Sequence, residues 1–171
     1  KEMIIDYINK NYSEMKFTFI TNEHYLDTNT SYSAYLCKDL LSSSDTLLMN
    51  GDVLYPPSLL KQIINSDYET VFAVDIKKCG DEEVKVIVDN NKRIISIGKE
   101  LNVDNSLGEF IGVAKLSIPF CNSFSSSLSK LIDDGGKSDY FESAIAPLLN
   151  THNVHFEDIT HLPCIEIDFN E

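Results

Sequence analysis

Two acidic residues follow short apolar segments at widely separated points of the chain. Asp52 comes after Thr46–Met49 and an Asn-Gly pair, and Asp168 follows residues 164–167. Each apolar segment is typical of a β-strand, and open α/β sheets bind ligands at the carboxyl ends of their strands. Two carboxylates at such ends can share one Mg²⁺ over a phosphate group, because this cation prefers oxygen ligands. We therefore expect Asp52 and Asp168 to form a metal site. Taken singly, either residue could equally be a turn, cap or solvated strand-end residue.

The spacing of apolar residues predicts the elements that must position these carboxylates. Helices are expected where apolar residues recur every three or four positions, and strands where they alternate or form short continuous runs. The predicted helices cover residues 1–11, 31–41, 58–65, 124–132 and 140–149. The predicted strands cover residues 16–20, 46–49, 70–74, 84–88, 93–97, 110–116, 154–159 and 164–167.

This order predicts an α/β fold of Rossmann-like type. Strands alternate with helices in the first half, which favours a mostly parallel sheet with helices on both faces, and the later hairpin makes the sheet mixed. No linker or repeat is visible, so residues 1–171 are expected to form a single domain. The chain opens inside a helix, without the strand and Gly-rich loop that begin most phosphate-binding α/β domains. We expect it to be truncated at the N-terminus by a strand–loop–helix unit of roughly 30 residues.

Composition excludes several classes of partner. The 171 residues carry 27 acidic and 14 basic side chains, a net charge of −13, which argues against nucleic acid as a ligand. No apolar run approaches the ~20 residues of a membrane span. The four cysteines are far apart in sequence and include no CxxC pair, so neither a zinc site nor a disulfide framework is expected. We expect a cytoplasmic protein with reduced thiols.

Six short segments occur in a fixed order along the chain: 28–34 (TNTSYSA), 49–52 (MNGD), 81–86 (DEEVKV), 97–101 (IGKEL), 108–113 (GEFIGV) and 165–168 (IEID). Together and in this order they resemble the sugar-phosphate-type nucleotidyltransferases. The resemblance is strongest to those that make CDP-activated choline or aminoethylphosphonate. The resemblance implies transfer of a nucleoside monophosphate from a nucleoside triphosphate to a phosphate or phosphonate oxygen, with release of pyrophosphate.

The resemblance also implies roles for individual residues. The residues matching Asp52 and Asp168 hold Mg²⁺ in such enzymes, and Asp52 and Lys85 are the expected catalytic residues. Lys85, together with Lys99, would face substrate phosphate, and Glu109 would lie on the acceptor side.

Further substrate contacts are expected at six residues, three of them from the resemblance and three from their position and residue type. The segment matching 29–33 lies beside the nucleobase, which assigns base contacts to Asn29, Ser31 and Ser33; as a plain pattern, Ser31 is a helix cap. Asp75 ends a predicted strand and is expected to contact ribose or acceptor. Tyr140 and Glu142 would suit a quaternary or primary ammonium group, although Tyr140 could equally be a core residue.

We therefore expect Mg²⁺-dependent transfer, most simply of CMP from CTP to phosphocholine or a related aminoalkyl phosphate or phosphonate. A sugar-1-phosphate acceptor is the near alternative. The family's Gly-rich loop is absent and its aromatic residue before the last motif is Cys164, so a catalytically silent fragment of the same fold is the second alternative. A sheet edge left open by the missing unit predicts homo-oligomerisation.

Overall fold

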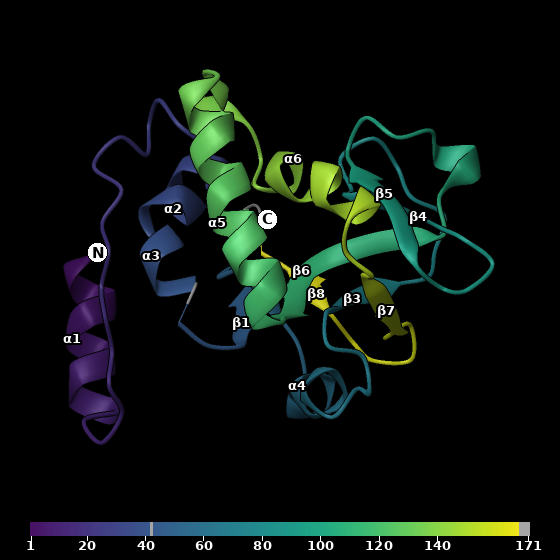
Figure 1. Ribbon diagram of the computed structural model, residues 1–171. Helices are drawn as coiled ribbons and strands as arrows, with labels where there is room; N and C mark the ends of the chain where they lie inside the picture. Colours follow the sequence, from purple (N-terminus) through teal and green to yellow (C-terminus); the bar gives the residue numbers. More distant parts are fainter. Residues whose placement is uncertain (42, 168–171) are drawn as a thin grey trace.

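The computed structural model describes residues 1–41 and 43–167. A six-stranded sheet forms its centre, built around the nine-residue strand β6 (Figure 1). The strands run in the order β5-β4-β6-β3-β7, and β1 also pairs with β6. Their bounds are β1 Thr46–Met49, β3 Val71–Asp75, β4 Lys85–Val88, β5 Ile94–Gly98, β6 Gly108–Leu116 and β7 His155–Asp158. A separate two-stranded sheet pairs β2 (Val53–Leu54) with β8 (Ile165–Glu166).

The sheet is mixed, as expected, but its pairings are not mostly parallel. Strand β6 is antiparallel to β1, β3 and β4, and β3 with β7 is the one parallel pair among the described residues. These registers nevertheless make β1, β3, β4 and β7 point the same way. The long strand β6 runs in the opposite direction and separates β3 from β1 and β4, so these three strands pair with β6 instead of with each other. Helix–strand alternation therefore predicted strand direction, whereas the late insertion of β6 decided the pairing.

Helices cover both faces of the sheet, as predicted. On one face Phe72 and Val74 of β3 pack with Phe120 and Phe124 of α5 (Ile118–Asp133), in a cluster that also includes α6 (Glu142–Ile145). On the other face Val71 and Ala73 pack with Leu59 and Ile63 of α4 (Pro57–Ile64). Figure 1 shows α5 and α6 above the sheet and α4 below it. Strand β3 is thus buried on both sides, which explains its continuous apolar run.

Two predicted helices are interrupted. The 31–41 segment forms α2 (Thr30–Leu36) and α3 (Lys38–Leu41), and the 140–149 segment forms α6 followed by the 3₁₀ turn η3 (Ala146–Asn150). Pro147 has no N–H to continue an α-helix, which accounts for the second break. Helix α5 begins six residues earlier than predicted, with Pro119 in its first turn. The remaining 3₁₀ turns are η1 (Val103–Asn105) and η2 (Gly136–Ser138).

The first 20 residues pack least. Helix α1 (Glu2–Asn11) forms where predicted but contains no buried residue. The strand predicted at 16–20 is wrong: these residues form no strand, and Phe17, Phe19 and Ile20 are exposed. A strand needs a neighbour to satisfy its backbone groups, and none lies beside this segment in the described chain. Within the described residues, the helices are all too short or too polar to cross a membrane.

Candidate functional site

A cleft of about 810 Å³ opens where the carboxyl ends of β1 and β3 meet the start of β6. Seven of the predicted site residues line it: Asn29, Asp52, Asp75, Lys99, Glu109, Tyr140 and Glu142. They come from six separate parts of the chain, so the fold gathers most of the predicted set into one place. Ser31, Ser33 and Lys85 do not line the cleft. Asp168 lies outside the described residues.

Asp52 stands where the two-stranded sheet joins the cleft. Its carbonyl oxygen accepts a hydrogen bond from the Ile167 N–H at 2.9 Å, and Val53 pairs with Glu166 in the β2–β8 ladder. The chain immediately before residue 168 is therefore held at Asp52, although the two are far apart in sequence. Among residues 1–41 and 43–167, no group of three or more His, Cys, Asp or Glu side chains is arranged to hold a metal ion. The proposed Mg²⁺ pair, Asp52 with Asp168, stays a prediction.

The floor of the cleft carries an ion-paired cluster. Asp75 and Glu109 are cross-strand partners in β3 and β6, and Lys77 bridges them, with Nζ 2.7 Å from Glu109 Oε2 and 3.7 Å from Asp75 Oδ2. Partial burial lowers the pKa of Lys77. The hydrogen bond to Glu109 and the negative charges of Glu109 and Asp75 raise it by more, so the pKa lies above its ordinary value. Gly108 permits this approach, because a Cβ there would overlap the Asp75 carbonyl. Lys77 was not predicted; its position two residues beyond Asp75 was the available signal.

One wall of the cleft combines a lysine, an aromatic ring and two acids. Lys99 Nζ lies 4.6 Å from the centre of the Tyr140 ring and 3.5 Å from Glu82 Oε2. Glu142 is only 5% exposed, and its Oε2 has no hydrogen-bond partner. Burial raises the pKa of Glu142 to about 7, while a bond to its own backbone and the charge of Lys99 lower it less. This carboxyl therefore changes charge near neutral pH, beside a cation and a ring.

The position of Lys85 does not fit the predicted contact with phosphate. Its side chain is buried, and Nζ donates to the carbonyl oxygens of Asp81 at 3.1 Å, Glu83 at 3.2 Å and Lys99 at 2.7 Å. All three N–H donors of the ammonium are engaged, so none is left for a substrate. Lys85 instead fixes the 81–83 turn against Lys99, and thereby positions two charged segments that line the cleft.

Of the three residues predicted beside the base, Asn29 alone reaches the cleft. Its side chain caps α2 by accepting from the Thr30 N–H at 2.8 Å, so the cap is Asn29 rather than Ser31. Ser31 is buried and donates to the Gly136 carbonyl at 2.7 Å. Ser33 is exposed and accepts from Asn22 at 3.1 Å. The two serines thus hold α2 in place rather than face the cleft.

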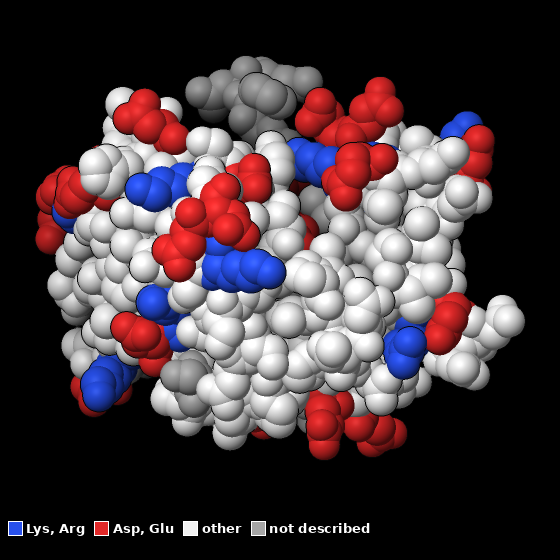
Figure 2. Space-filling model, turned by 45° about the horizontal axis from the view of Figure 1, so that its top comes forward, with Lys and Arg blue, Asp and Glu red and all other residues white. Residues whose placement is uncertain are grey.

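The charge of the cleft is strongly negative. Its lining includes two lysines, Lys77 and Lys99, against seven acids: Asp52, Asp75, Glu82, Glu83, Glu109, Glu142 and Glu166. Both lysines already lie beside acidic side chains. Acidic side chains also outnumber basic ones on the face of the molecule in Figure 2. Such a cleft favours cations, and a polyphosphate entering it needs added positive charge.

No protein-family model matches the sequence, and comparison with curated proteins finds no match. Solved structures do match. The inositol-1-phosphate CTP transferase from T. maritima aligns at 20% identity with a TM-score of 0.72, over 97% of this chain and 65% of that one. The CTP:phosphocholine cytidylyltransferase from Streptococcus pneumoniae aligns at 17% identity with a TM-score of 0.77, over 97% and 68%. A putative glucose-1-phosphate thymidylyltransferase from Bacillus anthracis aligns at 11% identity with a TM-score of 0.68, over 96% and 65%.

These likenesses establish the fold. The chain has the fold of the sugar-phosphate-type nucleotidyltransferases, which confirms the resemblance drawn from its six segments at that level. It spans 65% of the length of the T. maritima and B. anthracis chains and 68% of the S. pneumoniae chain. At such low identity the fold carries over, whereas substrates and site roles do not.

Proposed function

We propose that this chain is the main part of a Mg²⁺-dependent nucleotidyltransferase that transfers CMP from CTP to an aminoalkyl phosphate or phosphonate such as phosphocholine. The observation that carries the proposal is the cleft itself. In a nucleotidyltransferase fold, strand ends bring Asp52, Asp75 and Glu109 around one opening, and the backbone of Asp52 is bonded to the residue that precedes Asp168.

The reaction does not require a side chain that acts as a strong acid or base. An oxygen of the acceptor phosphate attacks the α-phosphorus of CTP, the bond to the β-phosphate oxygen breaks, and pyrophosphate leaves. The attacking oxygen is already anionic, so no strong general base is required. When bound, Mg²⁺ would neutralise charge on the α-phosphate. Asp52 and Asp168 are the residues proposed to hold it, and Lys99 is the proposed contact for substrate phosphate.

The acidic lining favours an acceptor that carries a positive charge. Glu142 and Tyr140 offer a carboxylate and a ring at one wall, the combination that binds ammonium groups. Above pH 7 Glu142 would be mostly ionised and would pair with such a group. A sugar-1-phosphate carries no positively charged group and would gain nothing from this charge, which is why we rank it second.

A catalytically silent domain is the second candidate function, and one observation favours it. Lys77 and Lys99, the two lysines of the described cleft lining, both lie beside acids. A triphosphate would therefore meet mainly negative charge in this chain, so turnover by the 171 residues alone is expected to be slow.

Pyrophosphate release from CTP and phosphocholine, measured with and without Mg²⁺, tests the proposal. We expect Mg²⁺-dependent release that falls by about a hundredfold or more in Asp52→Asn, which keeps the shape of the side chain and removes its charge. Asp67→Asn is the matched control, since this exposed aspartate lies outside the cleft.

The outcomes separate the candidates. Equal release by the wild type and Asp52→Asn would overturn the enzymatic proposal for this chain. Binding of CTP and Mg²⁺ by calorimetry, without any release, would favour the silent domain. Faster release with glucose-1-phosphate than with phosphocholine would replace the acceptor but keep the reaction.

A further inference from the structure

Strand β6 carries a bulge in its middle. Its register against β3 slips between Phe72 and Val74, where the three residues 111–113 of β6 lie opposite a single residue of β3. The excess of residues is even, so side chains before and after it keep their faces, and Phe110 and Ala114 lie in the same core cluster. Bulges bend a strand and re-aim the side chains beside it, and they are frequent next to active sites.

Gly112 lies at the centre of this bulge, at a position that requires glycine. Its φ of +75° falls in the left-handed region, which residues with a Cβ seldom adopt. The space beside it is also filled, because a Cβ at Gly112 would overlap the Cβ, Cγ and Nδ2 atoms of Asn50. The side chain of Asn50 therefore rests on Gly112, in the place where any other residue would carry its own side chain.

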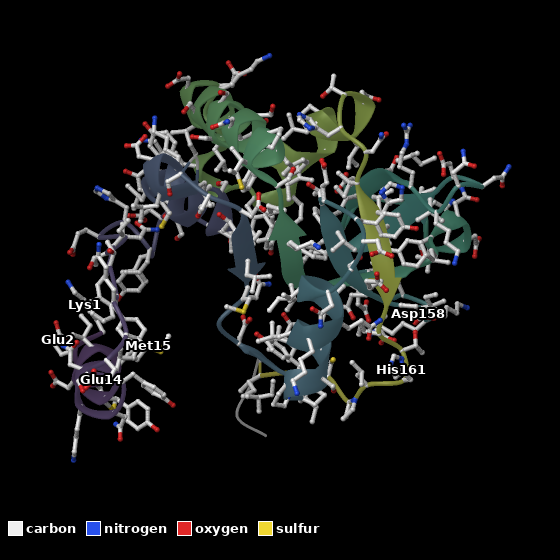
Figure 3. The ribbon with its side chains drawn as sticks, turned by 60° about the horizontal axis from the view of Figure 1, so that its bottom comes forward. Lys1, Glu2, Glu14, Met15, Asp158 and His161 are labelled. Atoms are coloured by element: carbon white, nitrogen blue, oxygen red, sulfur yellow. The ribbon has the colours of Figure 1, made fainter. Side chains whose placement is uncertain are left out.

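A backbone hydrogen bond joins the same two residues. The Asn50 N–H donates to the Gly112 carbonyl oxygen at 2.8 Å, one residue beyond the last β1–β6 pair, Met49 with Val113. Figures 1 and 3 both show β1 and β6 side by side. Gly112 thus holds Asn50 at two points, through its carbonyl oxygen and through its bare α-carbon.

The chain passes from this contact directly into the cleft. Asn50 and Asp52 both line the cleft, and Gly51 lies between them in open space. The Asp52 carbonyl oxygen then accepts from the Ile167 N–H at 2.9 Å. The loop of residues 50–52 is therefore fixed at one end by Gly112 and at the other by Ile167, and these two contacts set where the Asp52 carboxylate lies.

We infer that Asn50 and Gly112 are a positioning pair for Asp52: the bulge of β6 seats the Asn50 side chain, and this seat directs the Asp52 carboxylate into the cleft. A displacement of about 1 Å at a site group can cost far more than a single contact. The metal role of Asp52 belongs to the proposed function, and the functional part of this inference rests on it. The positioning itself uses contacts within the protein alone.

Hydrogen exchange tests the positioning without metal or turnover. Asn50→Ala removes the side chain that rests on Gly112 and keeps the backbone N–H. The amides at the two ends of the loop, those of residue 50 and Ile167, should then exchange about tenfold faster after correction for intrinsic rates, with β3 unchanged. Gly51→Ala is the matched control, because its Cβ would meet no atom within contact distance, and it should exchange like the wild type.

Binding of Mn²⁺, followed by electron paramagnetic resonance, tests the consequence for the cleft. Mn²⁺ prefers the same oxygen ligands as Mg²⁺. Asn50→Ala should weaken Mn²⁺ binding about tenfold although it changes no charge, because groups that orient a ligand contribute on this scale. Gly51→Ala should bind Mn²⁺ as tightly as the wild type.

A double variant separates positioning from simple packing. Gly112→Ala should lower the urea midpoint of unfolding, because of its φ and its overlap with Asn50. In Asn50→Gly, Gly112→Ala the overlapping atoms are gone, so part of the lost stability should return. Its Mn²⁺ affinity should nevertheless stay low, because the seat is still missing. Recovery of stability and affinity together would overturn the positioning role.

The remaining outcomes separate this inference from the proposed function. Unchanged exchange at both loop-end amides in Asn50→Ala would overturn the inference, whatever the metal does. Faster exchange with wild-type Mn²⁺ affinity would show that the pair does not direct the Asp52 carboxylate, and would overturn it too. A wild type that binds no Mn²⁺, with a loop that Asn50→Ala still loosens, would keep the pair and remove the metal role of Asp52 from the proposed function.

Discussion

Helices α1 and α4 have similar amphipathic patterns but differ in how far their apolar faces are buried. In α4, Leu59 and Ile63 are fully buried against β3 and β6, whereas α1 buries none of its residues. The same contrast separates two apolar strand patterns, since the first four residues of β3 are fully buried while residues 16–20 pair with nothing described. A periodic pattern specifies which face of an element is apolar. Whether that face is covered depends on what else folds beside it.

The largest expected effect comes from truncating the same residue type in the two helices. Ile63→Ala should lower the free energy of unfolding by about 3 kcal/mol, because it leaves a cavity in a packed core. Ile4→Ala should change it by less than about 0.5 kcal/mol, because Ile4 is 64% exposed. Urea unfolding of both variants measures the difference. Equal losses would mean that α1 packs against the rest of the molecule in solution.

A second pair of variants contrasts buried and exposed lysines. Lys85→Met should destabilise the protein by about 2 kcal/mol, because three carbonyl groups lose a charged donor. Lys10→Met, on the exposed α1, should be nearly neutral. If Lys85 positions the 81–83 turn rather than binding phosphate, Lys85→Met should also speed hydrogen exchange in that turn, by mass spectrometry. A variant of unchanged stability that loses only nucleotide binding would restore the direct role.

The last expected effect depends on pH. Because burial raises the pKa of Glu142 from its ordinary value of 4.5 to about 7, its stabilising contribution is full below pH 4.5 and is lost as the pH rises through 7. Glu142→Gln should therefore be more stable than the wild type by up to about 3 kcal/mol at pH 8, and nearly equal to it at pH 4. Glu14→Gln, at an exposed site shortly after α1, is the control and should leave the pH profile unchanged. Thermal unfolding across this range measures both, and parallel profiles for Glu142→Gln and the wild type would contradict the prediction.

Much of the fold could be predicted because its elements have local signals. The β1 strand was predicted with its observed bounds, and most other elements were predicted to within a few residues, since period and flanking turn residues are local properties. Pairing was less predictable. Nothing local indicates that β6 enters between β1, β4 and β3 and reverses the expected parallel neighbours.

The site residues likewise include some that local sequence signals indicated and others that only the folded chain revealed. Residues that end strands, such as Asp52 and Asp75, were found by their position in the pattern, and they do line the cleft. Lys85 lies in a segment that matches the family pattern, but its buried ammonium donates hydrogen bonds to backbone carbonyl groups instead of facing the cleft. Lys77 was overlooked although it lies two residues beyond Asp75, because its partner Glu109 is brought 2.7 Å from it only by a neighbouring strand.

The sequence by itself indicated most of the helical and extended segments, which of their faces are apolar, and that carboxylates follow the ends of two predicted strands. The tertiary structure decided which apolar faces are covered, which lysine faces the cleft, and that Glu142 lies where its charge is costly. The reason is physical: periodicity acts over a few residues, whereas burial and electrostatics depend on atoms that only the folded chain brings together.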